Sequence, residues 1–436
     1  MSYRAPICSL VGILFFAHAS LASEAVVLDD SGTTLKDWRD VVSMLHANSP
    51  DALTAQADAA RAQAAARSSL AAALPTVSGA WQGGYVLRGP PPGNINGFTL
   101  PPADPLSERA TLGLSVPLFA PSAWYGARQA SRTADARMYT AQDAFRRAEL
   151  SAASAVVDLV TAERVLEINL ISLTAAEDRL KLVRKRFELG AATRPDVLRV
   201  EQDTINARAT VITSEESRRQ SREALALSLG SNKPVSISPS LRIDAVVQSL
   251  IAACPAASDA LAQRPDIRAA ETALDALASS KKQVTAQYLP TLAAGANVAS
   301  SVRDWAPTWS ITGMLSVPIW DGGARYGAGR DVAAQTRRAE VQRDLAVRQA
   351  QVELARSERA VKVSEETLTV TKQATEAARE NDKLVTRAFE EGRGTSLELV
   401  TAGASLRQAE VQLVVKEYEA LRAKAAFVLS RTACDL

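Results

Sequence analysis

The hexapeptide Leu114-Ser-Val-Pro-Leu-Phe119 is the main sequence evidence for the fold, because it returns 201 positions later as Leu315-Ser-Val-Pro-Ile-Trp320. Further along, Phe187-Glu-Leu-Gly190 returns 202 positions later as Phe389-Glu-Glu-Gly392. A repeat of about 200 residues is far longer than the unit of a solenoid, which spans roughly 20 to 50 residues. The chain therefore consists of one structural unit written twice.

The two copies differ in the length of one loop. Ahead of the hexapeptide, Ala73-Leu-Pro-Thr76 returns 215 positions later as Tyr288-Leu-Pro-Thr291. The fall from 215 to 201 means that the first copy carries the longer loop, residues 89–107, which holds six prolines. We expect a first repeat over residues 36–230, a proline-containing linker over 231–258 and a second repeat over 259–430.

Each copy is predicted to contain two strands after its first helix. In the first copy they run over about Thr76–Arg88 and Arg109–Phe119, and apolar residues fill every second position of the latter. The second copy repeats the alternation, with apolar positions at Leu292, Ala294, Ala296, Val298 and Val302 and then at Trp309, Ile311, Leu315, Val317 and Ile319. Such alternation is typical of a strand between lipid and water, and a soluble sandwich strand has the same pattern.

A very long helix follows the strands in each copy, over Ser122–Glu188 and Gly323–Glu391. Small or apolar residues recur along it in steps of three and four, which is the heptad pattern of a coiled coil. In the first copy they are Ala141, Phe145, Ala148, Ala152, Ala155, Leu159, Ala162, Leu166, Leu173, Ala176, Leu180, Val183 and Phe187. Polar Asn169 interrupts this seam, and Thr375 and Asp382 interrupt its counterpart in the second copy.

The helix lengths predict a rod. Each long helix extends about 100 Å at 1.5 Å per residue. Two shorter helices accompany it, over Pro50–Ala73 and Pro195–Leu229 in the first copy and over Pro265–Gln287 and Ser396–Ser430 in the second. Placed end to end, each short pair nearly matches the long helix. One unbroken helix beside two stacked shorter ones gives a rod of uniform length.

Composition excludes several classes of protein. Lys and Arg number 50 against 48 Asp and Glu, so the chain lacks the basic excess of a nucleic-acid-binding protein. Its only histidines are His18 and His46, and its cysteines are Cys8, Cys254 and Cys434. These are too few for a zinc cluster or an HExxH helix. We therefore expect no catalytic residues, no cofactor and no metal site, and so not an enzyme.

Residues 1–22 have the pattern of a secretory signal peptide. Arg4 precedes an apolar run from Ile7 to Ala17 that is too short to span a membrane, and small residues follow up to the expected cleavage site after Ala22. The remaining sequence has no apolar stretch of the roughly 18 residues that a spanning helix needs. The exported chain is expected to enter a membrane, if it does so, as a closed β-barrel.

The motifs, in this order and duplicated, resemble those of the TolC-like outer membrane efflux protein family. The most specific are Leu261-Ala-Gln-Arg-Pro-Asp-Ile-Arg-Ala-Ala-Glu271, the Leu-Pro before each first strand, the Ser-Val-Pro before each long helix, and the turns Phe187–Leu198 and Phe389–Val400. The resemblance implies a mainly α fold with a small β part. It also implies a homotrimer whose twelve-stranded outer-membrane β-barrel continues into a twelve-helix periplasmic α-barrel.

The resemblance also implies a function, the outer-membrane exit duct of a tripartite exporter. A periplasmic adaptor and an inner-membrane RND or ABC transporter would complete such a machine. Efflux of drugs, metals or other small molecules is favoured, since the Arg-Pro-Asp motif resembles ducts of proton-driven pumps. Two alternatives stay open: the outer membrane component of type I protein secretion, and an exported coiled-coil scaffold without channel activity.

The turns that follow the long helices form the candidate site. Each has a glycine that ends the long helix, a threonine that suits the N-cap of the return helix, and an acid three residues on as its capping-box partner. These residues are Gly190, Thr193 and Asp196 in the first copy and Gly392, Thr395 and Glu398 in the second. The capping role is the structural reading of both acids.

The resemblance adds a functional reading for the second turn. It implies that Glu398 lines a closed periplasmic aperture and that Phe389 and Arg393 match positions where side chains latch neighbouring helices. Thr401 stands where the best-known member of the family has a second acid, which weakens the expectation of a strong cation-binding ring. Three copies of Glu398 around a threefold axis would still repel one another and attract cations.

A disulfide between Cys254 and Cys434 is allowed in an exported protein. One cysteine lies in the expected linker and the other just past the last helix, so both are expected near the middle of the rod. Two free thiols are the alternative.

Overall fold

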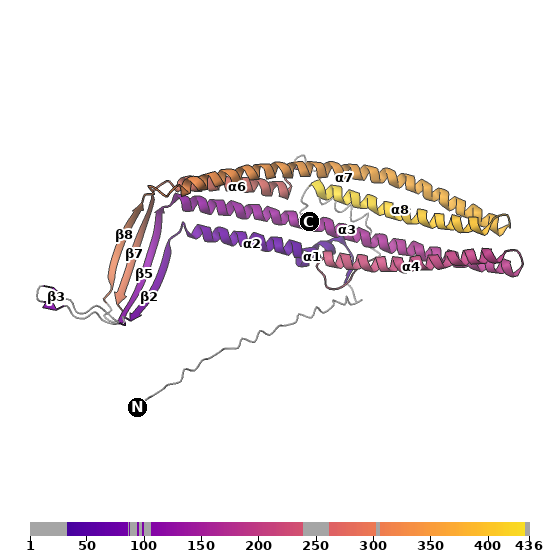
Figure 1. The fold of residues 1–436 in the computed structure, drawn as a ribbon, viewed down its shortest axis with the longest axis horizontal. Coiled ribbons are helices and arrows are strands. Elements are labelled where there is room, and N and C mark those ends of the chain that lie inside the picture. The colour runs from indigo at the N-terminus through magenta and orange to yellow at the C-terminus, as the bar shows by residue number, and fades with distance from the viewer. Residues whose placement is uncertain are drawn as a thin grey trace, which may run out of the picture.

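The computed structural model describes residues 33–85, 87, 94–95, 98–99, 106–238, 261–301 and 306–431. These residues form a long bundle of helices with a strand-built end that is set at an angle to it (Figure 1). The expected signal peptide, Cys254 and Cys434 lie outside the described residues.

The four predicted strands form one antiparallel sheet in the order β2-β5-β7-β8. Its strands are β2 (Thr76–Tyr85), β5 (Leu106–Phe119), β7 (Thr291–Ser301) and β8 (Thr308–Ser316). Leu112 pairs with Val298, and Val298 with Trp309, so the register brings the apolar positions of both copies to one face. The alternation that the sequence predicted is therefore a property of the whole sheet.

The strand boundaries differ from those predicted. β2 ends at Tyr85, before the expected Arg88, and β5 begins at Leu106, before the expected Arg109, so the loop between them is shifted along the sequence rather than shortened. The two prolines also act differently. Pro117 stays inside β5 opposite Ala293, with an irregularity in pairing just after it, whereas β8 ends at Ser316, before Pro318. A proline lacks the backbone N–H of the ladder, so it is confined to irregular or terminal positions.

Within the described residues, six helices build the rod in the predicted arrangement. They are α2 (Pro50–Ala71), α3 (Pro121–Glu188) and α4 (Arg194–Ser228) in the first copy and α6 (Pro265–Ala286), α7 (Ala324–Glu390) and α8 (Ser396–Arg431) in the second. The long α3 packs against α2, α4, α6 and α8, while α7 packs against α6 and α8 (Figure 1). The edges of the bundle are therefore α7 on one side and α2 with α4 on the other.

A small unit at mid-rod was not predicted. Helix α1 (Trp38–Asn48) packs with a parallel pair of short strands, β1 (Thr33–Leu35) and β6 (Val235–Ile237). Strand β6 lies in the segment that the sequence assigned to the linker. The apolar residues of this unit join the helices in one core, whose fully buried members include Leu35, Leu45, Leu159, Leu225, Leu229, Val235 and Leu429. A further hairpin, β3 (Asn94–Ile95) and β4 (Phe98–Thr99), lies in the proline-containing loop.

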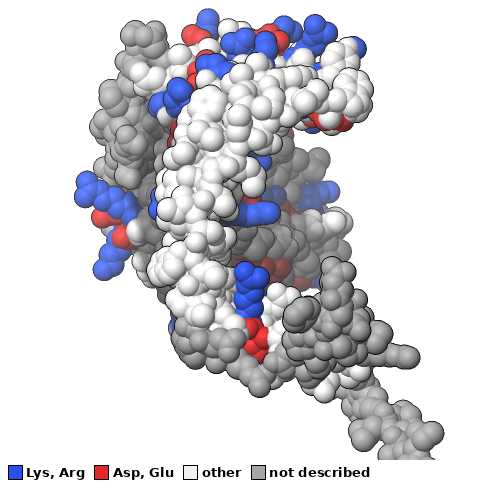
Figure 2. Space-filling model, turned by 90° about the vertical axis from the view of Figure 1, so that its left-hand side faces the viewer, with Lys and Arg blue, Asp and Glu red and all other residues white. Residues whose placement is uncertain are grey.

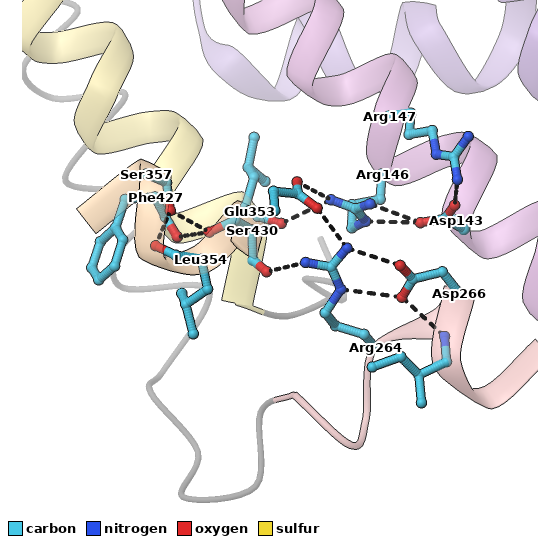
Figure 3. Close-up of polar contacts among 12 residues, drawn as sticks. Asp143, Arg146, Arg147, Arg264, Asp266, Glu353, Leu354, Ser357, Phe427 and Ser430 are labelled. Carbon is cyan, nitrogen blue, oxygen red and sulfur yellow. Dashed lines mark hydrogen bonds and ion pairs between the residues drawn. The ribbon is translucent and has the colours of Figure 1, made fainter. Parts of the chain in front are cut away.

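A buried ion cluster marks the point where α6 begins and α8 ends (Figure 3). The guanidinium of Arg264 is 1% exposed and donates to the Ser430 carbonyl at 2.8 Å, to Glu353 at 2.8 Å and to Asp266 at 2.9 Å. Arg146 of α3 donates to the Leu429 carbonyl at 3.4 Å. The two arginines therefore supply the donors that the last carbonyls of α8 lack within their own helix.

Replacing Arg264 by alanine should lower the free energy of unfolding by about 3 kcal/mol, because it leaves a buried charged cluster without its central partner. Denaturant unfolding of the detergent-solubilised protein measures the change. Arg208→Ala is the matched control, since Arg208 forms an exposed ion pair with Glu177 at 3.1 Å and such pairs contribute about 1 kcal/mol or less. Equal losses in the two variants would contradict the structural role of Arg264.

Candidate functional site

The two turns at the end of the rod are built alike. Gly190 has φ +75° and Gly392 has φ +79°, the left-handed conformation in which glycine carries no steric cost. The backbone N–H of the residue after each glycine donates to a carbonyl of the preceding helix: Ala191 to Arg186 at 2.8 Å, and Arg393 to Ala388 at 2.8 Å. The predicted helix ends are confirmed at both glycines.

The capping boxes are also present in both copies. The backbone N–H of Thr193 donates to Asp196 at 2.9 Å, and that of Thr395 donates to Glu398 at 2.9 Å. The N–H of Glu398 in turn donates to the Thr395 hydroxyl at 3.2 Å. Both acids therefore stabilise the first turn of their helices. Glu398 remains exposed, and the hydrogen bonds from Thr395 lower the pKa of its carboxyl group.

Asp196 has a second role that the sequence did not predict. It accepts a hydrogen bond from the Ser396 hydroxyl of the other copy, and that hydroxyl also receives an Arg199 N–H at 2.8 Å. The hydrogen bonds from Ser396 and Thr193 lower the pKa of Asp196 to about 2. Asp196 therefore joins the two turns as a charged acceptor. Its contact with Ser396 depends on the approach of residues 200 positions apart, which no local pattern shows.

Phe389 lies inside the tip, by which we mean the end of the rod that carries the two turns. It is 5% exposed and packs among Val183, Val197, Val200 and Leu399. Its basic partner is Arg186 of the first copy, whose guanidinium lies 4.8 Å from the ring centroid and donates to the Phe389 carbonyl. Arg393 instead points to solvent and pairs with Glu391 of its own turn. Within one chain, the contact of Arg186 with Phe389 therefore joins the two helical hairpins, α3–α4 and α7–α8. The sequence analysis identified only Phe389 of this pair.

Asp382, which interrupts the apolar seam, has a partner at a level of the rod farther from the turns than Phe389. The guanidinium of Arg179 on α3 lies 3.8 Å from Asp382 on α7 and 3.8 Å from Asp203 on α4. Gly403 on α8 leaves the space that Arg179 occupies, because a side chain there would overlap the guanidinium. Burial raises the pKa of Asp382, against the opposing charge of Arg179. This polar link joins three of the four tip helices.

The described residues include no group of three or more His, Cys, Asp or Glu side chains that could hold a metal ion. In the same part of the chain, every helix is too short or too polar to cross a membrane. The expected Cys254–Cys434 pairing falls outside the described residues and stays a prediction.

Asp196→Asn should loosen the contact between the two turns, because the pKa of Asp196 is lowered from 3.8 to about 2 in the folded state. This contribution is complete above pH 3.8 and is lost as the pH falls toward 2. The protection of the amides at the start of α8, taken relative to the intrinsic exchange rate at each pH, should be high in the unmodified protein down to about pH 4 and fall below it. In the variant this protection should be low already at neutral pH.

The control is Thr401→Ala, which removes a hydroxyl that bonds only carbonyls of its own helix, at Leu397 and Glu398. Exchange that matches the unmodified protein in Asp196→Asn would contradict the link to Ser396.

Known proteins resemble this chain in sequence. A family model described as outer membrane efflux protein matches residues 41–231 and 256–429. Toluene efflux pump outer membrane protein TtgF of Pseudomonas putida is 30% identical over 171 residues, which cover 37% of this chain and 35% of that protein. Fusaric acid resistance protein FusA of Burkholderia cepacia is 28% identical over 333 residues, covering 69% and 60%. The matches span about one third to three fifths of these relatives.

Solved structures share the fold. The CmeC outer membrane channel of Campylobacter jejuni superposes with a TM-score of 0.77 at 16% identity, over 91% of this chain and 85% of that chain. An identity this low speaks for the fold alone. The family model, by contrast, matches most of the residues of both repeats. The protein therefore belongs to the outer membrane efflux protein family, which confirms the resemblance seen in its motifs and the expected location in the outer membrane.

Proposed function

We propose that this chain forms, as a homotrimer, the outer-membrane exit duct of a tripartite exporter of small molecules. The observation that carries the proposal is a four-stranded sheet with two open edges and an exposed apolar face at one end of a long helical rod. A soluble scaffold would gain nothing from such a sheet, since open edges and apolar faces promote aggregation in water.

The sheet suits one third of a β-barrel. Strands β2 and β8 are its outer strands, and each has one edge without a partner strand in the described chain. Trp81 is 66% exposed, Trp309 is 78% exposed and Ile311 is 89% exposed, all on the apolar face. Figure 2 shows this end of the molecule, where a broad uncharged surface follows the sheet. Three copies of four strands would pair every edge and turn the apolar face to lipid.

Exposed apolar stripes on the edge helices also favour packing between copies of the chain. Apolar side chains that remain exposed recur at multiples of seven on the two edge helices: Leu198, Ile205 and Ile212 on α4, and Val363, Val370 and Leu384 on α7. Such stripes are typical of coiled-coil seams. The stripe on α7 of one subunit would pack against α4 of the next, which gives twelve helices around a trimer axis.

The geometry supports a duct that reaches from the outer membrane into the periplasm. Helix α3 has 68 residues and so extends about 100 Å between the sheet and the turns. Glu398 would then meet its two symmetry mates at the far tip, as the aperture that the resemblance implies. A periplasmic adaptor and an inner-membrane RND or ABC transporter would deliver the cargo there. Small organic molecules are the favoured cargo, by analogy with the toluene and fusaric acid of the relatives' names.

Purified protein should form trimers that open brief, small, cation-selective conductances in a planar lipid bilayer. The expected state is mostly closed, because the links between the two hairpins hold the tip together. Native mass measurement in detergent and single-channel recording test both parts. A monomer that never inserts would refute the duct and favour the coiled-coil scaffold.

Glu398→Ala should raise the leak conductance of the closed channel and weaken block by divalent cations, since three carboxylates on one axis attract cations. Recording with and without magnesium at fixed ionic strength measures both effects. Asp178→Ala is the control, because Asp178 is an exposed acid that pairs with Lys181 on α3. A cation response that is identical in the two variants would remove Glu398 from the aperture.

A further inference from the structure

Several duplicated positions have opposite burial in the two copies. Arg146 on α3 is 4% exposed, whereas its counterpart 202 positions later, Arg348 on α7, is exposed. Leu429 at the end of α8 is fully buried, whereas its counterpart Leu227 at the end of α4 is 78% exposed. Arg348 and Leu227 are of the same residue types as their buried counterparts. In the single chain they therefore lack a neighbour that those counterparts have.

The place of each helix in the bundle explains the difference. Helix α3 lies inside the bundle, and its Arg146 faces the junction where α6 begins and α8 ends (Figure 3). Helix α7 lies at the edge. Its seam residue Ala350 is buried, while Leu345, Arg348 and Val352, at spacings of three and four along α7, are exposed beside a groove that Ala426 and Ser430 of α8 also line. The face of α7 that they form is the counterpart of the α3 surface that covers the second junction.

The chemistry of the second junction defines what Arg348 would need. Arg146 donates to the Leu429 carbonyl at 3.4 Å and pairs with Asp143 at 2.9 Å. It shares Glu353 with Arg264, which also binds Asp266, so the two arginines and the three acids form one cluster. A guanidinium in such a place needs a carboxylate and carbonyl oxygens to offset the loss of water.

Only part of this set has a counterpart at the first junction. The carbonyl of Leu429 corresponds to that of Leu227, and Asp266 corresponds to Asp51 in the earlier segment, 215 positions before it. The other two acids have no acidic counterpart. Leu345 occupies the position equivalent to Asp143, and Ser151 occupies the position equivalent to Glu353. Asp51 is exposed, and neither it nor Arg348 forms an ion pair within the described part of the chain. One acid and one arginine are thus left without a partner on opposite edges.

We propose that Arg348 of one subunit docks on the junction of α2 and α4 of the next subunit, where it pairs with Asp51 and donates to the carbonyl of Leu227. The inference rests on the proposed homotrimer and assigns a residue contact to it. Leu345 and Val352 flank the arginine and cover Leu227, which is buried by this contact. The occupant of this face of α7 is therefore a second copy of the chain.

The space around Arg348 fits an incoming helix end. Leu345, Arg348 and Val352 line part of a groove of about 740 Å³ beside α7. Its walls are largely apolar, which suits the exposed Leu227 side chain, and the arginine supplies the positive charge that complements Asp51. The same side chains are exposed in the single chain at a cost that pairing with a second copy would remove.

Cross-linking tests the contact directly. In a background with Cys254 and Cys434 replaced by serine, Arg348→Cys and Asp51→Cys are combined in one chain and treated with a short bismaleimide. Because α7 and α2 lie on opposite edges of the bundle, a link between these positions joins two chains. We expect covalent dimers and trimers on a denaturing gel, and none from either single-cysteine variant. A trimer that yields no ladder would overturn the contact and leave the proposed function standing.

Charge reversal gives an independent readout. Arg348→Glu and Asp51→Arg should each lower the temperature at which the detergent-solubilised trimer dissociates, and the double variant should recover most of the loss. Arg422→Glu is the matched control, because Arg422 pairs with Asp158 inside one chain at 3.1 Å. Additive losses without recovery would refute the pairing. A protein that is monomeric before any substitution would refute the contact together with the proposed homotrimer.

Discussion

The buried guanidinium of Arg264 stabilises the junction of α8 and α6, and the alignment of the whole rod rests on this junction. There α8 ends and α6 begins, so the last carbonyls of one helix and the first turn of the next must find partners away from water. Arg264 supplies them by bridging the Ser430 carbonyl, Glu353 and Asp266. This junction holds the two short helices α6 and α8 end to end. The unbroken helices α3 and α7 run beside them and set the distance between the sheet and the turns.

The first junction solves the same geometric problem with different chemistry. Ser49 stands where the second copy has Arg264, and the neighbouring core is apolar, built from α1, β1 and β6. A duplicated unit tolerates this divergence because its two junctions have different surroundings. The second lies between α3 and α7 of one chain, whereas the first lies at the edge of the bundle, where the next copy completes it in the trimer that we propose.

The tip is held differently from the middle of the rod. Its apolar cluster is small, and much of the contact between hairpins is polar: Arg186 with Phe389, Asp196 and Arg199 with Ser396, and Arg179 with Asp203 and Asp382. Buried polar links contribute modestly to stability but are costly to misalign. Regions with few apolar contacts also open at lower free energy than a core. This balance would suit a tip that opens without unfolding the rod, as the duct that we propose requires.

From the sequence alone one can predict the duplication, the six described rod helices, the four strands of the sheet, and the turn chemistry of Gly190, Gly392 and the two capping boxes. Each of these depends on local periodicity or on residues within one helical turn, which a linear pattern records. It missed α1, β1 and β6, since short elements that are stabilised by tertiary packing have no periodicity of their own. Long-range contacts follow from the tertiary packing alone: Arg186 with Phe389 and Ser396 with Asp196 join the two copies, and Arg264 with Ser430 joins distant parts of the second copy. Those contacts join segments that are far apart along the chain, and their geometry is set by how the helices pack.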